Sequence, residues 1–396
     1  MTDPYERLTA PTMNNQRIAI VVPAIEGGGA EVVARKWAEA LGHRDHRVDV
    51  ITTHRVPSAP VTGFNLVPLT PPKSGVIAAV RALKATFETG RYDTVVSLLT
   101  FSNLLCLLAA SLMRQSRPRI IISEHTLHSH RRAEYGVNMR GQQRLARLLY
   151  RYADGWIAPS HAVAAEMTTA YHLDNKKMWV VPNPVAFDAP SQEPDYYKRP
   201  PNAPLRLVFV GRILAPKRPE LVLDIAAHLT SSWGEPVVVD FIGDGDLRPQ
   251  LSAMAANHPF PVNFHGWVDQ WHKHCEPGSV LVVPSPIEGF GNVLIEAASA
   301  GIPVVVSSRC LGAADACIPG VTGQLISDDS VPSFSAAIRK ASFARTAEVQ
   351  AWLNRFTIES AAELLHLAVS GSADKITPSP QAGNQPTKTV AGGKTK

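Results

Sequence analysis

Cysteine is scarce in this chain of 396 residues, and its four copies are widely scattered. Cys106, Cys275, Cys310 and Cys317 form no Cys-x-x-Cys pair and lack zinc-finger spacing, which argues against a disulfide framework or a zinc module. The first residues, MTDPYERLTAPTMNNQR, lack the apolar run of a signal peptide. We therefore expect a cytoplasmic protein with reduced, buried thiols.

Charge is also sparse, since Asp, Glu, Lys and Arg make up 18% of the residues. The segment Thr94–Met113 carries no charge and is long enough to span a membrane. Its polar break TFSN divides it, however, into a strand, VVSLL, and a helix, LLCLLAASLM, with Ser102 or Asn103 as the cap. We favour a buried strand followed by a helix over a transmembrane segment.

The charges are unevenly distributed along the chain. Residues 1–200 hold 24 Lys and Arg against 17 Asp and Glu, whereas residues 201–396 hold 15 against 17. The basic half is expected to face an anionic partner. Within residues 131–152, one helical stripe is basic and a neighbouring stripe is apolar; the two comprise Arg140, Arg144, Arg147, Arg151 and Leu145, Leu148, Leu149, Tyr152.

Two interpretations of this basic helix remain open. The favoured one is the solvated face of a packed helix, and the other is a surface that meets an anionic membrane or a lipid diphosphate. No aromatic residues alternate with the arginines, so nucleic acid is not an expected partner.

The length and the alternation of elements predict two domains. Apolar strands such as RIAIVVPA (17–24), RVDVITTH (47–54) and RIIISEHT (119–126) alternate with helical segments, as in parallel α/β sheets. A Pro-rich polar stretch, 192–204, is typical of a linker. We expect two Rossmann-like domains, 17–191 and 205–350, then a helix at 351–369, with disordered ends at 1–16 and 370–396.

The strongest candidate site is the stretch Val282–Ser308, which reads as strand, loop, helix and strand. The strand ends at Ser285, and the helix begins near Asn292, a plausible N-cap, and stops at Gly301. Its first N–H groups can bind a phosphate. Glu288 in the loop and Glu296 in the helix could meet hydroxyls on the two sides of a diphosphate.

Basic residues follow another strand, LVFV, in the second half of the chain. This strand delivers Gly211 and Arg212 to its carboxyl edge, and Lys217 follows just before a helix. Such a pair of cations could clamp a diphosphate. The Asp244-Gly-Asp246 sequence suggests a metal site, but a glycine turn with Asp246 capping the next helix is the favoured interpretation. No metal and no bound cofactor are expected.

The sequence PSPIEGFGNVLIEAASAGIPVVVS resembles the signature of glycosyltransferase family 4, the retaining transferases of GT-B fold. The resemblance spans about residues 17–369 and is firmest in 205–326. It implies that Glu288 contacts the donor sugar, that Glu296 contacts the nucleotide ribose, and that Arg212 and Lys217 hold the diphosphate. The remaining nucleotide-sugar-binding positions that we predict are Gly28, Gly29, Gly211, Gly243, Gly266, Gly289, Phe290, Gly291, Asn292 and Val293.

The resemblance also points to a histidine after the fifth strand. His125 matches a family histidine that touches the donor sugar and the acceptor, although His128 and His130 lie nearby. A histidine that is partly buried and satisfied within the fold is the alternative. The chain departs from the family at Gly312-Ala-Ala-Asp315, where a Gly-Pro-x-Glu sequence is common, so the donor contacts of that loop stay open.

The activity implied is retaining transfer of a sugar from a nucleoside-diphosphate sugar to a hydroxyl, in polysaccharide or glycoconjugate synthesis. The resemblance suggests a front-face mechanism in which the leaving phosphate helps to take the acceptor proton. The basic first half favours a polyprenyl-diphosphate glycan or glycolipid acceptor, with peripheral binding at the inner face of the plasma membrane. The alternatives are a nucleotide-sugar 2-epimerase of the same fold and a non-catalytic nucleotide-sugar-binding subunit. The donor base is not readable.

Overall fold

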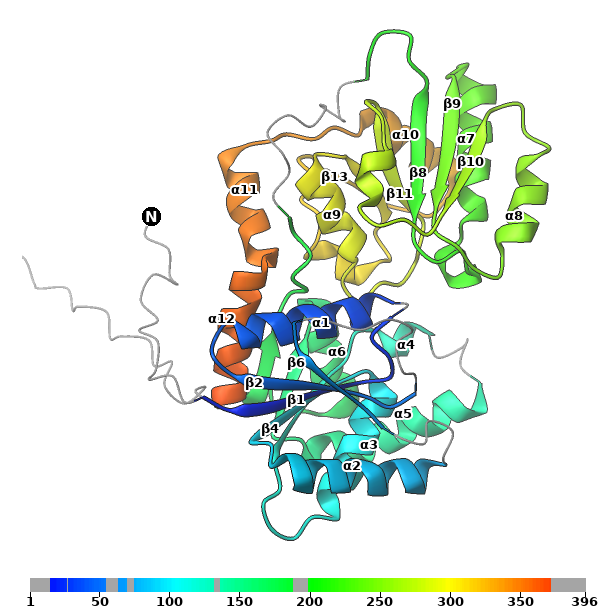
Figure 1. Cartoon of the computed structure of the whole chain (residues 1–396). Coiled ribbons are helices and arrows are strands. Elements are labelled where there is room, and N and C mark those ends of the chain that lie inside the picture. The colour runs from blue at the N-terminus through cyan, green and yellow to red at the C-terminus, as the bar shows by residue number, and fades with distance from the viewer. Residues whose placement is uncertain are drawn as a thin grey trace, which may run out of the picture.

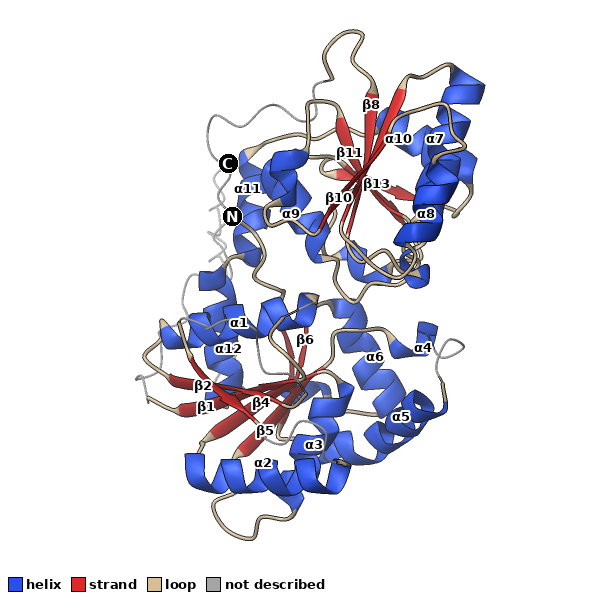
Figure 2. Ribbon diagram, turned by 45° about the vertical axis from the view of Figure 1, so that its right-hand side comes forward, coloured by secondary structure: helices blue, strands red, loops and turns tan. Residues whose placement is uncertain are grey.

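Two α/β lobes make up the protein, as the alternating pattern predicts (Figure 1). The computed structural model describes residues 15–26, 28–54, 63–69, 75–131, 136–187 and 199–371. The predicted disordered ends therefore lie almost entirely outside the described residues, as does most of the predicted linker, 192–204. Figure 2 shows one sheet in each lobe, with helix α1 on the side of the first lobe that faces the second.

The first lobe is built on a parallel sheet of seven strands in the order β3-β2-β1-β4-β5-β6-β7. In the centre of this sheet, Ile18 of β1 lies opposite Val48 of β2 on one side and Thr94 of β4 on the other. Helices cover both faces, which explains the uninterrupted apolar strands. The strands are β1 Arg17–Val22, β2 Arg47–Thr52, β3 Asn65–Pro68, β4 Thr94–Leu98, β5 Arg119–Ser123, β6 Gly155–Ala158 and β7 Met178–Val180.

The uncharged segment 94–113 forms β4 and a packed helix, α3, as predicted. No helix in the described part of the chain is both long and apolar enough to cross a membrane. The predicted cap was wrong, because α3 already begins at Thr100, after Leu99 with φ 73°. Asn103 instead donates to the Ser123 carbonyl at 2.9 Å. The first-lobe helices are α1 Gly29–Gly42, α2 Val76–Gly90, α3 Thr100–Ser111, α4 His128–Arg131, α5 Val137–Leu149 and α6 His161–Tyr171.

The second lobe repeats the plan with a parallel sheet of six strands, in the order β10-β9-β8-β11-β12-β13. Its strands are β8 Leu205–Val210, β9 Val237–Ile242, β10 Val262–Gly266, β11 Ser279–Val283, β12 Val304–Ser307 and β13 Gly323–Ile326. Its helices are α7 Glu220–Trp233, α8 Arg248–Ala255, α9 Asn292–Ala300, α10 Val331–Lys340 and α11 Ala347–Leu353. All four cysteines are buried free thiols, as expected.

The last helix, α12 (Ile358–Ser370), crosses back to the first lobe and packs against α1 (Figure 1). Ala361 and Leu365 of α12 are buried in the same core cluster as Ile18 and Trp37. The C-terminal helix, predicted over 351–369, begins later than expected, because α11 ends at Leu353 and a short 3-10 turn separates it from α12. This break lets the chain change lobes.

A buried pair of histidines fastens α12 to the first lobe. The Nε2 of His46 lies 3.0 Å from the Nδ1 of His366, and the two residues are 6% and 5% exposed, respectively. The backbone N–H of Gln16 donates to His46 Nδ1 at 3.2 Å, so His46 carries its proton on Nε2 and donates it to His366. Burial lowers the pKa of both histidines, and the neighbouring Arg44 guanidinium lowers both further.

The histidine pair predicts an acid-sensitive attachment of α12. Because the folded-state pKa values lie below the unfolded value of about 6.5, the stabilisation is complete above that pH and is lost as the pH falls. The thermal midpoint should therefore drop between pH 7.5 and pH 5.5 by roughly 2–4 °C more in the native protein than in His366→Leu. His43→Gln, which changes an exposed histidine, is the control and should behave like the native protein. Equal drops in all three proteins would refute the link.

Candidate functional site

A cavity of about 1010 Å³ lies between the two lobes and is lined by both. The carboxyl ends of β8, β9 and β11 open into it, as expected for ligand sites of parallel sheets. Of the site residues predicted from the sequence, all but Gly266 line this cavity. They are Gly28, Gly29, His125, Gly211, Arg212, Lys217, Gly243, Glu288, Gly289, Phe290, Gly291, Asn292, Val293 and Glu296.

The start of α9 supplies backbone donors to the cavity. Gly291 takes the cap position with φ 91°, a conformation that favours glycine. The prediction of Asn292 as the N-cap was therefore wrong, since it is the first helical residue and its side chain does not cap α9. The first amides of a helix have no acceptor within that helix, so those of Asn292 and Val293 are available to an anion.

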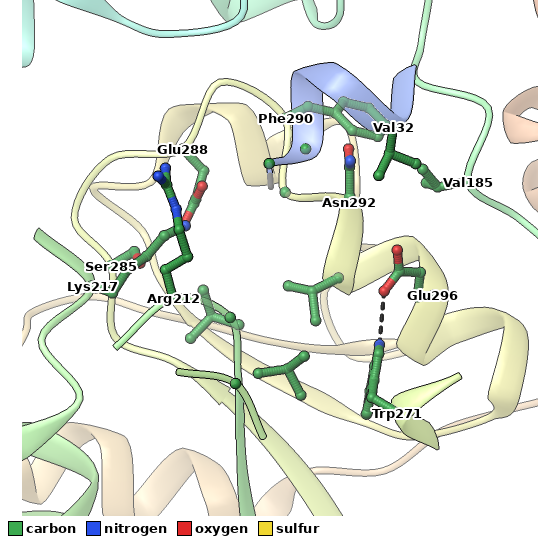
Figure 3. A pocket seen from close by; sticks show the side chains of 18 of the residues that line it. Val32, Val185, Arg212, Lys217, Trp271, Ser285, Glu288, Phe290, Asn292 and Glu296 are labelled. Carbon is green, nitrogen blue, oxygen red and sulfur yellow. Dashed lines mark hydrogen bonds and ion pairs between the residues drawn. The ribbon is translucent and has the colours of Figure 1, made fainter. Parts of the chain in front are cut away.

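Two cations and a carboxylate lie together at one end of the cavity (Figure 3). Lys217 forms an ion pair with Glu288 from the β11–α9 loop, and their side chains are 31% and 17% exposed. Arg212 is exposed on the cavity lining and makes no ion pair with another described residue. An anionic ligand could therefore bind Arg212 and draw Lys217 away from Glu288.

Glu296 lies at the other end of the cavity, with the start of α9 between it and Glu288 (Figure 3). The indole N–H of Trp271 donates to Glu296 Oε2 at 2.7 Å, which orients the carboxylate and leaves its other oxygen for a ligand. Burial raises the pKa of Glu296, while Trp271 and the nearby Lys36 of α1 oppose that rise. Trp271 and Lys36 were missed from the sequence, because neither lies in a motif.

His125 follows Glu124 after the end of β5 at Ser123 and lines the cavity from the first lobe. Its Nε2 is 3.0 Å from the Ser123 hydroxyl, and its ring lies 5.8 Å from the ring of Trp37. Burial lowers the pKa of His125 to about 4, so the imidazole is neutral at pH 7. His128, the competing candidate, is bound to Glu124 and Thr100 at 3.0 and 3.1 Å. The side chain of His130 lies outside the described residues.

Glycines at the ends of β8 and β9 leave this wall of the cavity, its floor, without side chains. A Cβ atom on Gly243 would stand 2.0 Å from the Gly211 carbonyl oxygen, and both residues have φ near 135°, at 135° and 134°. Gly266 ends the neighbouring strand β10, and its carbonyl accepts a hydrogen bond from the Gly243 N–H at 2.7 Å. It therefore supports the floor without lining the cavity itself.

The Asp244-Gly-Asp246 turn is organised by its own hydrogen bonds. Asp244 accepts from the Gly245 N–H at 2.8 Å and from the Arg248 guanidinium at 3.1 Å. Asp246 does not cap α8, as had been predicted, because Leu247 occupies that position without a side-chain bond. No group of three or more His, Cys, Asp or Glu side chains that could hold a metal ion occurs within the described ranges.

Backbone atoms bring the two lobes together at Gly289. A Cβ on this residue would lie 2.0 Å from the His125 carbonyl oxygen, so only glycine fits the contact. The Ser160 hydroxyl, which caps α6, also donates to the Gly289 carbonyl across the interface at 2.6 Å. The loop that carries Glu288 is thus held by the first lobe.

The loop around Gly312 and Asp315 forms a second contact between the lobes. Asp315 accepts from the His161 backbone N–H at 2.6 Å, and its other oxygen lies 3.1 Å from His161 Nδ1. A Cβ on Gly312 would stand 2.4 Å from the Glu288 carbonyl oxygen, so this loop packs directly against the loop that carries Glu288. Asp315 therefore joins the lobes at the position where the sequence departs from Gly-Pro-x-Glu.

Helix α5 presents its arginines to solvent on the first lobe. Arg140, Arg144 and Arg147 of α5 are exposed, as is Arg151 in the 3-10 turn that follows the helix. The apolar stripe predicted beside them is only partly packed, because Leu148 and Tyr152 are each 59% exposed. Ala146, rather than a leucine, is the buried residue of the helix.

Comparison with known proteins identifies the class to which this fold and site belong. Residues 27–189 match the family model described as Glycosyltransferase Family 4, and residues 204–342 match that described as Glycosyl transferases group 1. The chain belongs to glycosyltransferase family 4 and has the GT-B fold. It is accordingly a glycosyltransferase of the type that uses nucleotide sugars.

Two curated relatives cover most of the chain. D-inositol 3-phosphate glycosyltransferase of Geodermatophilus obscurus is 29% identical and covers 89% of this chain and 86% of its own length. The second is an α-1,4-N-acetyl-D-galactosaminyltransferase of Campylobacter jejuni, whose name specifies an undecaprenol-diphosphate glycan. It is 24% identical and covers 79% of this chain and 85% of its own length.

Solved structures show the same fold. The lipopolysaccharide outer core galactosyltransferase WaaB matches with a TM-score of 0.69 and 18% identity, covering 90% of this chain and 99% of its own. HepE of Anabaena, solved with UDP-glucose, matches with a TM-score of 0.62 and 19% identity, covering 91% and 98%.

The close contact at Gly289 predicts that one methyl group prevents the lobes from closing. Gly289→Ala should lower turnover by roughly a hundredfold, because the loop that carries Glu288 and the backbone of His125 can no longer come together. The thermal midpoint should change little, since each lobe keeps its own core. Steady-state kinetics and small-angle scattering measure the two effects. Gly141→Ala, at an open position on α5, is the matched control; an active, closed Gly289→Ala protein would contradict the prediction.

Proposed function

We propose that the protein transfers a glycosyl group from a nucleoside-diphosphate sugar to a hydroxyl of a glycan or lipid-linked acceptor, with retention of the anomeric configuration. The observation that supports this best is the arrangement of one cavity with cations at one end, the α9 amides in the middle and Glu296 at the other end. A diphosphate fits the centre, and the carboxylates of Glu288 and Glu296 fit the hydroxyls on either side.

The leaving group determines what the site must do. As the glycosidic bond breaks, negative charge develops on the diphosphate, and Arg212, Lys217 and the α9 amides stabilise it. Each such donor contributes about 2–4 kcal/mol in a dry site. Lys217 changes partner from Glu288 to the phosphate, which frees Glu288 to orient the transferred sugar. No bound metal is needed in this scheme, because these cations supply the positive charge.

His125 contributes on the acceptor side of the cavity. Its lowered pKa keeps the imidazole neutral at pH 7, so it can exchange hydrogen bonds with a sugar hydroxyl without repelling Arg212. In the front-face mechanism the departing phosphate takes the acceptor proton, and His125 positions that hydroxyl. Closure of the lobes excludes water and limits hydrolysis of the donor.

The acceptor in this proposal is a lipid-linked glycan. The basic first lobe and the name of the Campylobacter relative favour a polyprenyl-diphosphate glycan over a small soluble acceptor. The activity then belongs to polysaccharide or glycoconjugate synthesis. A 2-epimerase and a non-catalytic subunit are not favoured. The curated relatives described above are named as transferases, and the cavity contains all of Arg212, Lys217, Glu288 and Glu296.

The proposal predicts turnover that depends on Glu288 and not on metal. With a panel of UDP- and GDP-sugars and polyprenyl-diphosphate glycans, one pair should yield product whose anomeric proton, seen by NMR, keeps the donor configuration. EDTA should leave the rate unchanged, and Glu288→Gln should lower it by roughly a hundredfold or more with the fold intact. Inversion of the linkage, or an epimerised sugar formed from donor alone, would refute the proposed reaction.

The α5 helix supports a second proposal, that the first lobe binds the anionic inner face of the plasma membrane while the protein stays cytoplasmic. Exposed arginines lie there beside exposed apolar residues, including Val137 at 86% and Leu148 at 59%. Arginines attract anionic lipid headgroups, and the apolar side chains enter the headgroup layer.

Vesicle sedimentation tests this membrane contact. Arg144→Glu/Arg147→Glu should weaken binding to phosphatidylglycerol-rich vesicles by roughly tenfold or more, since each basic residue contributes about 1 kcal/mol near such a surface. Arg339→Glu/Lys340→Glu on α10 makes the same change of charge on the second lobe and should bind like the native protein. If both variants lose binding equally, α5 is not the contact.

A further inference from the structure

The chain passes from the first lobe to the second through a rigid segment that contains Asn183. Val181 is buried in the core of the first lobe, and Val185 is buried in the core of the second. Pro182 and Pro184 flank Asn183, and the Val185 N–H donates back to the Asn183 carbonyl at 2.9 Å. Two cores and two prolines therefore fix the position of this asparagine.

The Asn183 side chain joins the lobes at the start of α9. Its Nδ2 donates to Asn292 Oδ1 at 2.7 Å. Asn292 also meets α1, because a Cβ atom on Gly29 would lie 3.3 Å from Asn292 Nδ2. Figure 3 shows Asn292 beside Val185 at this part of the cavity. The crossing segment, α1 and the phosphate-binding end of α9 thus converge on one amide pair.

The other side-chain atom of Asn183 has no partner. Asn183 is 5% exposed, and its Oδ1 accepts no hydrogen bond from any described residue. Four further buried polar side-chain atoms in the described chain share this condition, on Trp37, Thr52, Ser102 and Thr230, and none of those residues lines the cavity. A buried acceptor without a partner is unfavourable, so a donor from a ligand would relieve it.

We propose that Asn183 Oδ1 accepts a hydrogen bond from a hydroxyl or amide N–H of the bound nucleotide sugar, which makes Asn183 a donor-recognition residue. A phosphate oxygen cannot fill this role, because two acceptors repel each other. The inference rests on the proposed function. Because Asn183 also holds Asn292, a bound donor adds a bond at the point where the lobes meet and stabilises their closed arrangement.

Two alanine variants separate recognition from the link between the lobes. Asn183→Ala and Asn292→Ala both break the amide pair, but only the first removes the free acceptor. Binding to UDP, UDP-glucose, GDP and GDP-mannose is measured by calorimetry. For the sugar nucleotide that binds the native protein, Asn183→Ala should raise Kd roughly fivefold to tenfold more than Asn292→Ala, as expected for one lost hydrogen bond.

The nucleotides without a sugar locate the bond. If Asn183→Ala also weakens binding of the parent nucleoside diphosphate, the group that donates the hydrogen bond to Asn183 is on the nucleoside. If only binding of the sugar nucleotide is weakened, that group is on the glycosyl part. Equal losses in the two variants, or no loss in Asn183→Ala, would overturn the inference, and Asn183→Ser replaces that variant if it does not fold. Failure of the native protein to bind any of the four compounds would instead count against the proposed function.

Discussion

The site depends on the close approach of two backbones, where Gly289 of the second lobe meets the carbonyl of His125. No side chain intervenes, so the loop that carries Glu288 stands directly against the first lobe. The Ser160 hydroxyl and the Asp315–His161 contact reinforce the same junction. Each lobe alone presents only part of the cavity, and the two parts meet at this point.

The charged and polar groups of the cavity are arranged in an order that suits a nucleoside-diphosphate sugar. Positive charge gathers near Arg212 and Lys217, free amides lie at the start of α9, and Glu296 is held by Trp271 at the far end. The ion pair between Lys217 and Glu288 keeps both side chains in place while no phosphate is bound. In the proposed reaction a donor would exchange this internal pair for its own contacts, so that little rearrangement would be needed on binding.

Local sequence patterns predicted the fold and the centre of the candidate site, because both are formed by contiguous segments of the chain. An apolar strand, a glycine-flanked carboxylate and a helix start predict β11, the Glu288 loop and α9 without knowledge of the rest. Local patterns could not identify Lys36, Asn183 and Trp271 as site residues. The sequence around each of them carries no binding motif, and only the fold brings them to the cavity. Periodicity likewise predicts that α12 has an apolar face but does not say which lobe that face covers.

The return of α12 to the first lobe has a consequence for the order of synthesis. On the ribosome, the seven-stranded sheet emerges early, yet the surface of α1 that α12 covers stays bare until the whole second lobe has been made. The first lobe is therefore the first to begin and the last to finish folding. A nascent chain interrupted within residues 205–357 therefore leaves the apolar face of α1 uncovered.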